Sequence, residues 1–115
     1  MLEVKWIKDT EGNWLSFETF TIANVTASGV YMIWHGGQTP RIVRLGQGDI
    51  KSRLTAHRGD NQITQYRTSG LLMVTWASVP AAQQDGVERH LANQWPPLVG
   101  DAFPDVLPIV VNSPW

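Results

Sequence analysis

Two β-rich runs separated by a turn cluster constrain the fold of this chain more than any other feature. The runs occupy residues 29–34 and 41–45, and both are rich in β-branched, aromatic and other large apolar side chains. Residues 35–40 between them contain two glycines and end at Pro40, a composition typical of a turn. The pattern predicts a β-hairpin whose second strand is broken by residues 46–48, Gly-Gln-Gly.

A helix is predicted directly after the hairpin. Asp49 is placed to accept a hydrogen bond from the first free amides of a helix that runs to about residue 58. Ile50 and Leu54 form the expected buried stripe of this helix. Arg53 and His57 are also four residues apart, so both side chains can point at one place beside that stripe.

The rest of the chain predicts a small sheet flanked by helices. Residues 2–7 alternate like a strand, residues 14–25 fit either a strand or a short helix, and residues 71–77 read as a central strand buried on both faces. Pro80 suits the first turn of a second helix, which ends before two prolines at 96–97. The order β-β-α-β-α predicts an α/β (α+β) fold with a mostly antiparallel sheet.

The second helix has a defined core face. Val87, Leu91 and Trp95 recur every four residues along it, and Gly86 in its interior indicates a close contact with backbone. Beyond the helix the tail is rich in proline, with one strand-like piece at residues 109–111. We expect residues 1–28 to be an extension packed on a domain formed by residues 29–115, in a single globular unit.

Length and composition narrow the possible chemistry. The 115 residues suit one domain, without a separate DNA-binding domain. The absence of cysteine excludes disulfides, thiolate zinc sites and a cysteine nucleophile, which leaves oxygen and nitrogen ligands and a hard metal such as magnesium. Neither a leader-like start nor an apolar run of spanning length is seen, so a soluble cytoplasmic protein with no membrane partner is expected.

Basic residues are concentrated in one part of the chain. Residues 41–67 carry a net charge of +4, although the whole chain has a net charge of −1. A solvated, charged helix is one interpretation of this segment. Its overlap with Arg44 and Arg53 favours the other interpretation, which is a surface that faces anions.

A spaced series of residues resembles the GIY-YIG nuclease superfamily over residues 29–112. Its members here are Gly29-Val30-Tyr31, Arg44-Leu45-Gly46, Arg53, Glu88 and Asn112. The resemblance implies a DNA endonuclease that hydrolyses phosphodiesters with one Mg²⁺ or Mn²⁺ ion. It places the family's two motif tyrosines at Tyr31 and Arg44, and its metal-binding glutamate at Glu88.

The resemblance also implies a role for each residue. Tyr31 would orient a water or act as general base, provided that nearby cations lower its pKa. Arg44, Arg53 and Lys51 would bind substrate phosphate. His57 matches a histidine of some restriction enzymes in the family and would act as base, acid or hydrogen-bond donor. Glu88 would hold the metal unless it pairs with Arg53 or Arg89, and Asn112 is expected to be structural, tying the tail to the active-site region.

Arg44 departs from the family, because a tyrosine is usual at that position. A nuclease that uses Tyr31 or His57 as its base is compatible with this departure, and so is a nucleic-acid-binding module that has lost cleavage. A third possibility is a protein-interaction domain in which tryptophans such as Trp34 and Trp115 leave an apolar patch exposed. A homodimer or larger complex is compatible with each of these readings.

Overall fold

The computed structural model describes residues 1–100 and 103–115, and a four-stranded antiparallel sheet lies at its centre. In the order β1-β4-β2-β3, the strands are β1 (Leu15–Ser16), β4 (Leu72–Ser78), β2 (Ser28–His35) and β3 (Arg41–Asp49). The helices are α1 (Ile50–Arg58), α2 (Asn61–Thr64), the 3₁₀-helix η1 (Gln65–Thr68) and α3 (Ala81–Gln94). The predicted α+β class, hairpin and β-β-α-β-α order are confirmed.

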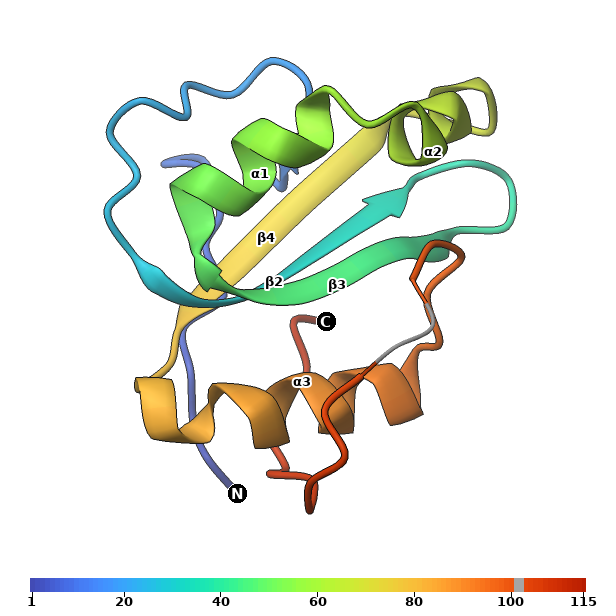
Figure 1. The fold of residues 1–115 in the computed structure, drawn as a ribbon. Helices are drawn as coiled ribbons and strands as arrows, with labels where there is room; N and C mark the ends of the chain where they lie inside the picture. The colour runs from blue at the N-terminus through green and yellow to red at the C-terminus, as the bar shows by residue number, and fades with distance from the viewer. Residues whose placement is uncertain (101–102) are drawn as a thin grey trace.

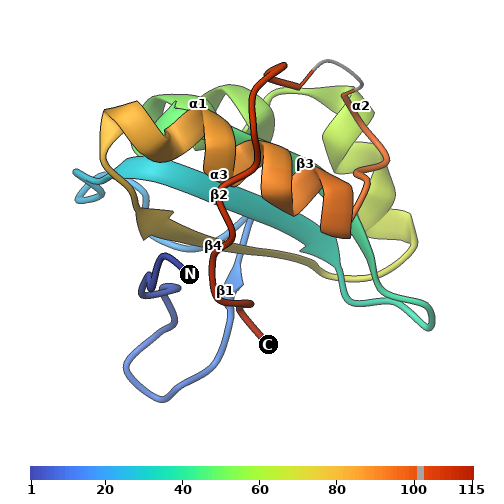
Figure 2. The same ribbon diagram turned by 90° about the horizontal axis from the view of Figure 1, so that it is seen from below.

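The sheet separates two apolar layers. Helices α1 and α2 lie over one face and α3 lies over the other, as Figures 1 and 2 show. Side chains of β2 alternate between these layers: Val30 and Met32 pack with α3, whereas Tyr31 and Ile33 pack with α1. Because β2 is buried on both faces and paired on both edges, its tyrosine is held rigidly inside the molecule.

Strand β3 is longer than the sequence predicts. It continues through residues 46–48 to Asp49, so the expected break at these glycines is wrong. Both glycines still pair with β2, Gly46 opposite Tyr31 and Gly48 opposite Gly29, because a ladder needs only backbone groups. The pairing of β2 with β3 also shifts its register between Ile33 and Trp34. The predicted cap is confirmed, since the Asp49 carboxylate accepts a hydrogen bond from the Ser52 amide at 3.0 Å.

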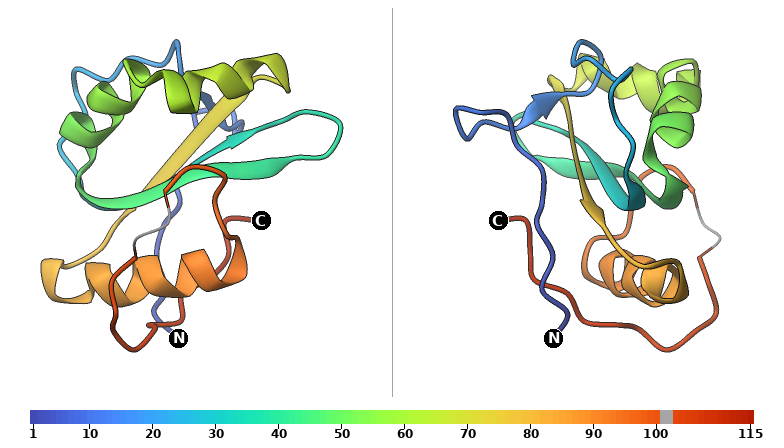
Figure 3. Two further views of the ribbon diagram at one scale, coloured as in Figure 1. Left: turned by 45° about the vertical axis from the view of Figure 1, so that its right-hand side comes forward. Right: turned by 90° about the vertical axis from the view of Figure 1, so that its left-hand side faces the viewer.

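The terminal segments are bound to the domain without forming the expected strands. Leu2 makes an isolated parallel bridge to Val111, and the Ile7 amide donates to the Trp76 carbonyl at 2.9 Å. The strands predicted at 2–7 and 109–111 are therefore wrong, although the two segments do lie side by side (Figure 3). Their alternating side chains are explained by packing on the core rather than by sheet pairing.

The remaining differences are local. Only Leu15–Ser16 of residues 14–25 is a strand, while residues 61–68 form the short helices α2 and η1 that the sequence did not predict. Pro80 is the N-cap of α3 rather than a residue of its first turn. Gly86 makes the expected close contact: its carbonyl accepts from the Ile109 amide at 2.9 Å, and a Cβ there would overlap the Ile109 side chain.

Candidate active site

Tyr31 and His57 form a direct pair across the sheet–helix interface. Tyr31 is 2% exposed on β2, and its hydroxyl lies 2.5 Å from Nε2 of His57 on α1. Burial raises the pKa of Tyr31, and the opposing charges of Arg44 and then Arg53 do not cancel this effect. Burial, reinforced by Arg44, lowers the pKa of His57 to about 4. At neutral pH the phenol is therefore protonated and the imidazole neutral, and the tautomer of His57 decides which of the two groups donates this hydrogen bond.

This protonation state bears on the condition set for Tyr31 by its sequence. The phenol was expected to orient a water, or to act as a base only if nearby cations lower its pKa. Both arginines do act in that direction, but the desolvation of a fully buried ring is the larger effect. The imidazole beside the Tyr31 hydroxyl is neutral at neutral pH, because burial lowers the pKa of His57.

Gly46 makes room for the tyrosine. It lies opposite Tyr31 in the β2–β3 ladder, and a Cβ at this position would overlap the Tyr31 hydroxyl and ring. The ring therefore crosses β3 through the space that a side chain would fill. This is a physical reason for glycine after Arg44-Leu45, independent of any family resemblance.

Gly48 has a second role in the same strand. Its φ of +113° lies in the region that favours glycine, and a Cβ there would lie 3.4 Å from Nε of Arg53. Arg53 is exposed on the first turns of α1, so its side chain passes close to the Gly48 backbone. With Asp49 capping α1, the segment after Leu45 positions both the helix and its arginine.

Arg44 lies on the edge strand between these groups and the C-terminal tail. Gly100 packs against its guanidinium, while Leu98 and Val99 donate hydrogen bonds to the carbonyls of Ile42 and Val43 at 3.0 and 2.9 Å. Nε of Arg44 is buried without a hydrogen-bond partner among the residues that the structure describes. The Arg44 guanidinium also acts on the Tyr31 hydroxyl, where it opposes the effect of burial on the pKa.

Two carboxylates converge on one amide at the other side of β3. Nε2 of Gln47 donates to Oδ1 of Asp85 at 2.6 Å and to Oε1 of Glu88 at 2.9 Å. Asp85 and Glu88 are three residues apart on α3, so they share a face of the helix. Burial raises the pKa of Glu88; Gln47 and then Arg44 oppose the shift, and Asp85 adds to it. Within the described chain, Glu88 forms no salt bridge with Arg53 or Arg89.

The structure thus brings most of the predicted site residues together at the β3 edge. Tyr31 and Glu88 each experience the charges of Arg44 and Arg53, and Tyr31 also experiences that of Glu88. We call this set the β3-edge cluster; its members are Tyr31, Arg44, Gln47, Arg53, His57, Asp85 and Glu88.

Two predicted residues are engaged elsewhere. Nζ of Lys51 donates to the Ala23 carbonyl at 3.1 Å, in the segment before β2. The Asn112 amide bonds both backbone groups of Val4, accepting from its N–H at 2.7 Å and donating to its C=O at 2.9 Å. Asn112 therefore ties the tail to the N-terminal segment rather than to the β3-edge cluster.

The basic residues of the segment 41–67 also differ in their contacts. Arg58 donates to the carbonyls of Phe17 and Phe20 at 3.0 and 2.6 Å, and Arg67 pairs with Glu18 at 3.2 Å. These arginines fasten the N-terminal segment to the helices. The other arginines of the segment, Arg41, Arg44 and Arg53, lie on β3 or in the helix that follows it, so the anion-facing surface stays a prediction for that edge.

Oxygen donors suited to magnesium are present but few. No group of three His, Cys, Asp or Glu side chains that would hold a metal occurs in residues 1–100 and 103–115. Glu88 and Asp85 supply two carboxylates, and rotation of the Gln47 amide would supply a third oxygen. Mg²⁺ commonly takes one or two carboxylates and completes its octahedron with water and phosphate oxygens, so this donor set fits.

Two cluster members were missed as ligands by the sequence analysis. Gln47 appeared only as part of the segment expected to break the second strand, and Asp85 was not considered. The signal for Asp85 was its position three residues before Glu88 on a helix, which places the two carboxylates on one face. No local signal links Gln47 to either residue, because their contact joins a strand and a helix that are far apart in sequence.

Comparisons with known proteins leave the family open. The chain matches no protein-family model, no curated protein and no solved structure. The GIY-YIG resemblance therefore rests on the motif residues themselves. In addition, no helix in the described chain is long and apolar enough to cross a membrane.

Proposed function

We propose that this domain is a metal-dependent endonuclease that hydrolyses DNA phosphodiester bonds. The observation that carries the proposal is the Tyr31–His57 hydrogen bond, set between two arginines and a pair of carboxylates held by Gln47. Phosphodiester hydrolysis needs a proton acceptor, positive charge near the phosphoryl oxygens and a hard cation. The β3-edge cluster contains side chains suited to each task.

The Tyr31–His57 pair supplies the proton acceptor. As water attacks phosphorus, its proton passes to the Tyr31 oxygen while the tyrosine proton moves to Nε2 of His57. The P–O bond to one deoxyribose oxygen breaks in the same step, and that oxygen leaves with a proton taken from solvent. A neutral imidazole with a lowered pKa is available to accept the tyrosine proton over the physiological pH range. The tyrosine thus acts as a relay, and the second motif tyrosine of the family is not needed for this step.

Arg44 and Arg53 supply charge for the phosphate. Guanidinium groups remain protonated and can bind two phosphate oxygens at once. Arg53 is exposed beside Gly48, and Arg44 reaches the cluster from the edge strand. Glu88, with Asp85 and Gln47, would hold one Mg²⁺ or Mn²⁺ ion, which when bound stabilises negative charge on the phosphoryl oxygens. A cytoplasmic location and assembly as a homodimer or larger complex belong to the same proposal.

A second candidate is a nucleic-acid-binding module without cleavage. Two features favour it. The Gln47 amide nitrogen donates hydrogen bonds to both the Asp85 and the Glu88 carboxylate. In addition, Arg44 replaces the second motif tyrosine of the family. In such a module the two arginines would still bind phosphate. Loss of the Glu88 charge would then strengthen DNA binding, because a carboxylate beside a phosphate repels it.

Cleavage of supercoiled plasmid with Mg²⁺ or Mn²⁺ separates the two candidates. Wild type should nick or linearise the plasmid, and Glu88→Gln and Tyr31→Phe should each abolish cleavage. The matched controls Glu3→Gln and Tyr66→Phe change the same residue types outside the cluster and should cleave like wild type. If wild type binds DNA at low salt but does not cut, and Glu88→Gln binds more tightly, the binding module is the correct function.

A further inference from the structure

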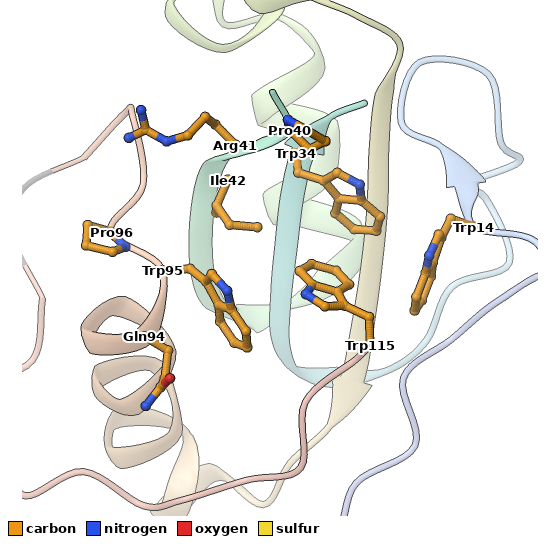
Figure 4. Close-up of a pocket in the computed structure, with 9 residues that line it drawn as sticks. All are labelled: Trp14, Trp34, Pro40, Arg41, Ile42, Gln94, Trp95, Pro96 and Trp115. Atoms are coloured by element: carbon orange, nitrogen blue, oxygen red, sulfur yellow. The ribbon is translucent and has the colours of Figure 1, made fainter. Parts of the chain in front are cut away.

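Four tryptophans line a pocket at the far end of β2. The cavity of about 460 Å³ lies between β2, β3 and the end of α3, within the range of small-molecule sites. Figure 4 shows the indole rings of Trp34, Trp95 and Trp115 around its centre, with Trp14 at the side. Pro40, Arg41, Ile42, Gln94 and Pro96 complete its lining.

Trp115 is the central ring of this arrangement. Its ring centroid lies 5.1 Å from that of Trp34, 5.6 Å from that of Trp95 and 6.0 Å from that of Trp14, all at steep interplanar angles. Trp34 is 8% exposed, whereas Trp115 is 54% exposed. Trp34 is thus a buried wall of the pocket, Trp14 and Trp95 are half-buried beside it, and Trp115 adds an aromatic surface that is open to solvent.

The charges around the pocket select the kind of ligand. Among the described side chains that line it, Arg41 alone is charged, and Nζ of Lys8 lies 4.3 Å from the centroid of the Trp14 ring. Both charges are positive, so a cationic ligand in an aromatic cage would be repelled. An aromatic ligand that carries a negative group is complementary instead, because its ring can stack on indole while its charge meets Arg41.

We propose that this tryptophan pocket binds an unpaired nucleobase of a DNA strand, with Arg41 on the adjoining phosphate. Stacking on aromatic side chains is how proteins hold single-stranded nucleic acid with little regard to sequence. A base within a duplex is already stacked on its neighbours and cannot enter such a pocket. The substrate class that follows is DNA with an unpaired or extruded base.

The pocket and the β3-edge cluster are built on the same two elements. Trp95 follows Glu88 by two turns of α3, which is about 10 Å, and Ile42 precedes Gln47 by five residues of β3, which is about 17 Å. At 3.4 Å per nucleotide, these distances correspond to roughly three to five nucleotides. This inference rests on the proposed function, and it adds that cleavage occurs a few nucleotides from the unpaired base.

The test compares a fully paired duplex with the same duplex carrying one unpaired thymidine and with one carrying an abasic site at that position. Anisotropy of labelled DNA, measured without metal, should show that the duplex with the unpaired thymidine is bound more tightly than the paired duplex and the duplex with the abasic site. Trp115→Ala should reduce the affinity for the duplex with the unpaired thymidine roughly 5- to 150-fold, and Arg41→Gln should lessen the salt dependence of that binding. The controls Leu107→Ala and Arg67→Gln, also at exposed positions, should bind like wild type.

The outcomes separate this inference from the nuclease proposal. Equal binding of the three duplexes, or a preference that Trp115→Ala and Arg41→Gln both retain, would overturn the pocket assignment even in a protein that cuts DNA. A preference lost in both variants supports it even if wild type does not cleave. Binding of a polyproline peptide that the variants abolish, with no preference among the duplexes, would overturn it in favour of a protein partner.

Discussion

Replacing Gly46 with alanine tests whether the β3 strand is built around the Tyr31 ring. The new Cβ would overlap the hydroxyl and ring of Tyr31. This tyrosine is 2% exposed, and its hydroxyl is hydrogen-bonded to His57. Overpacking a core costs about 1–3 kcal/mol, and a lost hydrogen bond about 1 kcal/mol. We therefore expect Gly46→Ala to lower the free energy of unfolding by about 2–4 kcal/mol.

The same magnitude predicts a large thermal effect. For 115 residues the entropy of unfolding is about 0.24 kcal/mol per kelvin, so the expected loss lowers Tm by about 8–16 °C. Urea and thermal unfolding measure both quantities. Gly59→Ala is the control, because a Cβ there meets only the Ala56 carbonyl oxygen at an ordinary 3.6 Å; it should be neutral or stabilising by up to about 1 kcal/mol.

A double-mutant cycle isolates the contact. In a Tyr31→Leu background the ring is gone, so the alanine at residue 46 should cost at most a few tenths of a kcal/mol, which is the size expected for independent sites. If Gly46→Ala is as stable as Gly59→Ala, or costs the same with and without the Tyr31 ring, the argument that glycine makes room for the tyrosine is refuted.

Three further substitutions follow from the structure. The pKa of His57 is about 4 in the folded protein against 6.5 in the unfolded chain, so the unfolded state takes up the proton first and stability falls as the pH drops from 6.5 to 4. With solvent screening this loss of unfolding free energy is on the order of 1–2 kcal/mol. In urea titrations over that pH range, His57→Gln should lose correspondingly less stability than wild type. Parallel pH profiles of the two proteins would contradict the assignment. Asp49→Ala removes the cap bond to Ser52 and should cost about 1 kcal/mol of unfolding free energy, whereas Asp105→Ala, at an exposed tail position, should cost much less; equal losses would argue against the cap. Asn112→Ala removes both bonds to Val4 and should cost about 1–3 kcal/mol; a change in DNA affinity at temperatures where the variant is fully folded would contradict its purely structural role.

Structure that is encoded by neighbouring residues was predictable from the sequence, and structure that depends on distant partners was not. The hairpin, the Asp49 cap and the strand at residues 72–78 were predictable, because side-chain alternation and capping chemistry act over a few residues. Residues 2–7 show the same alternation yet form no strand, since pairing requires a partner strand that composition does not reveal. The glycines at 46 and 48 were misread as a break because a ladder is formed by backbone groups.

The candidate site was likewise predictable from the sequence in part only. By itself the sequence determined which chemical groups are available: one tyrosine–arginine–histidine set, a glutamate on a later helix and no thiol. Only the tertiary structure placed Tyr31 beside His57 and buried both groups, which raises the pKa of the phenol and lowers that of the imidazole. It also decided that Gln47 and Asp85 join Glu88 and that four tryptophans meet at one pocket. Those contacts join elements far apart in the chain, and their energies depend on desolvation, which exists only once the core has formed.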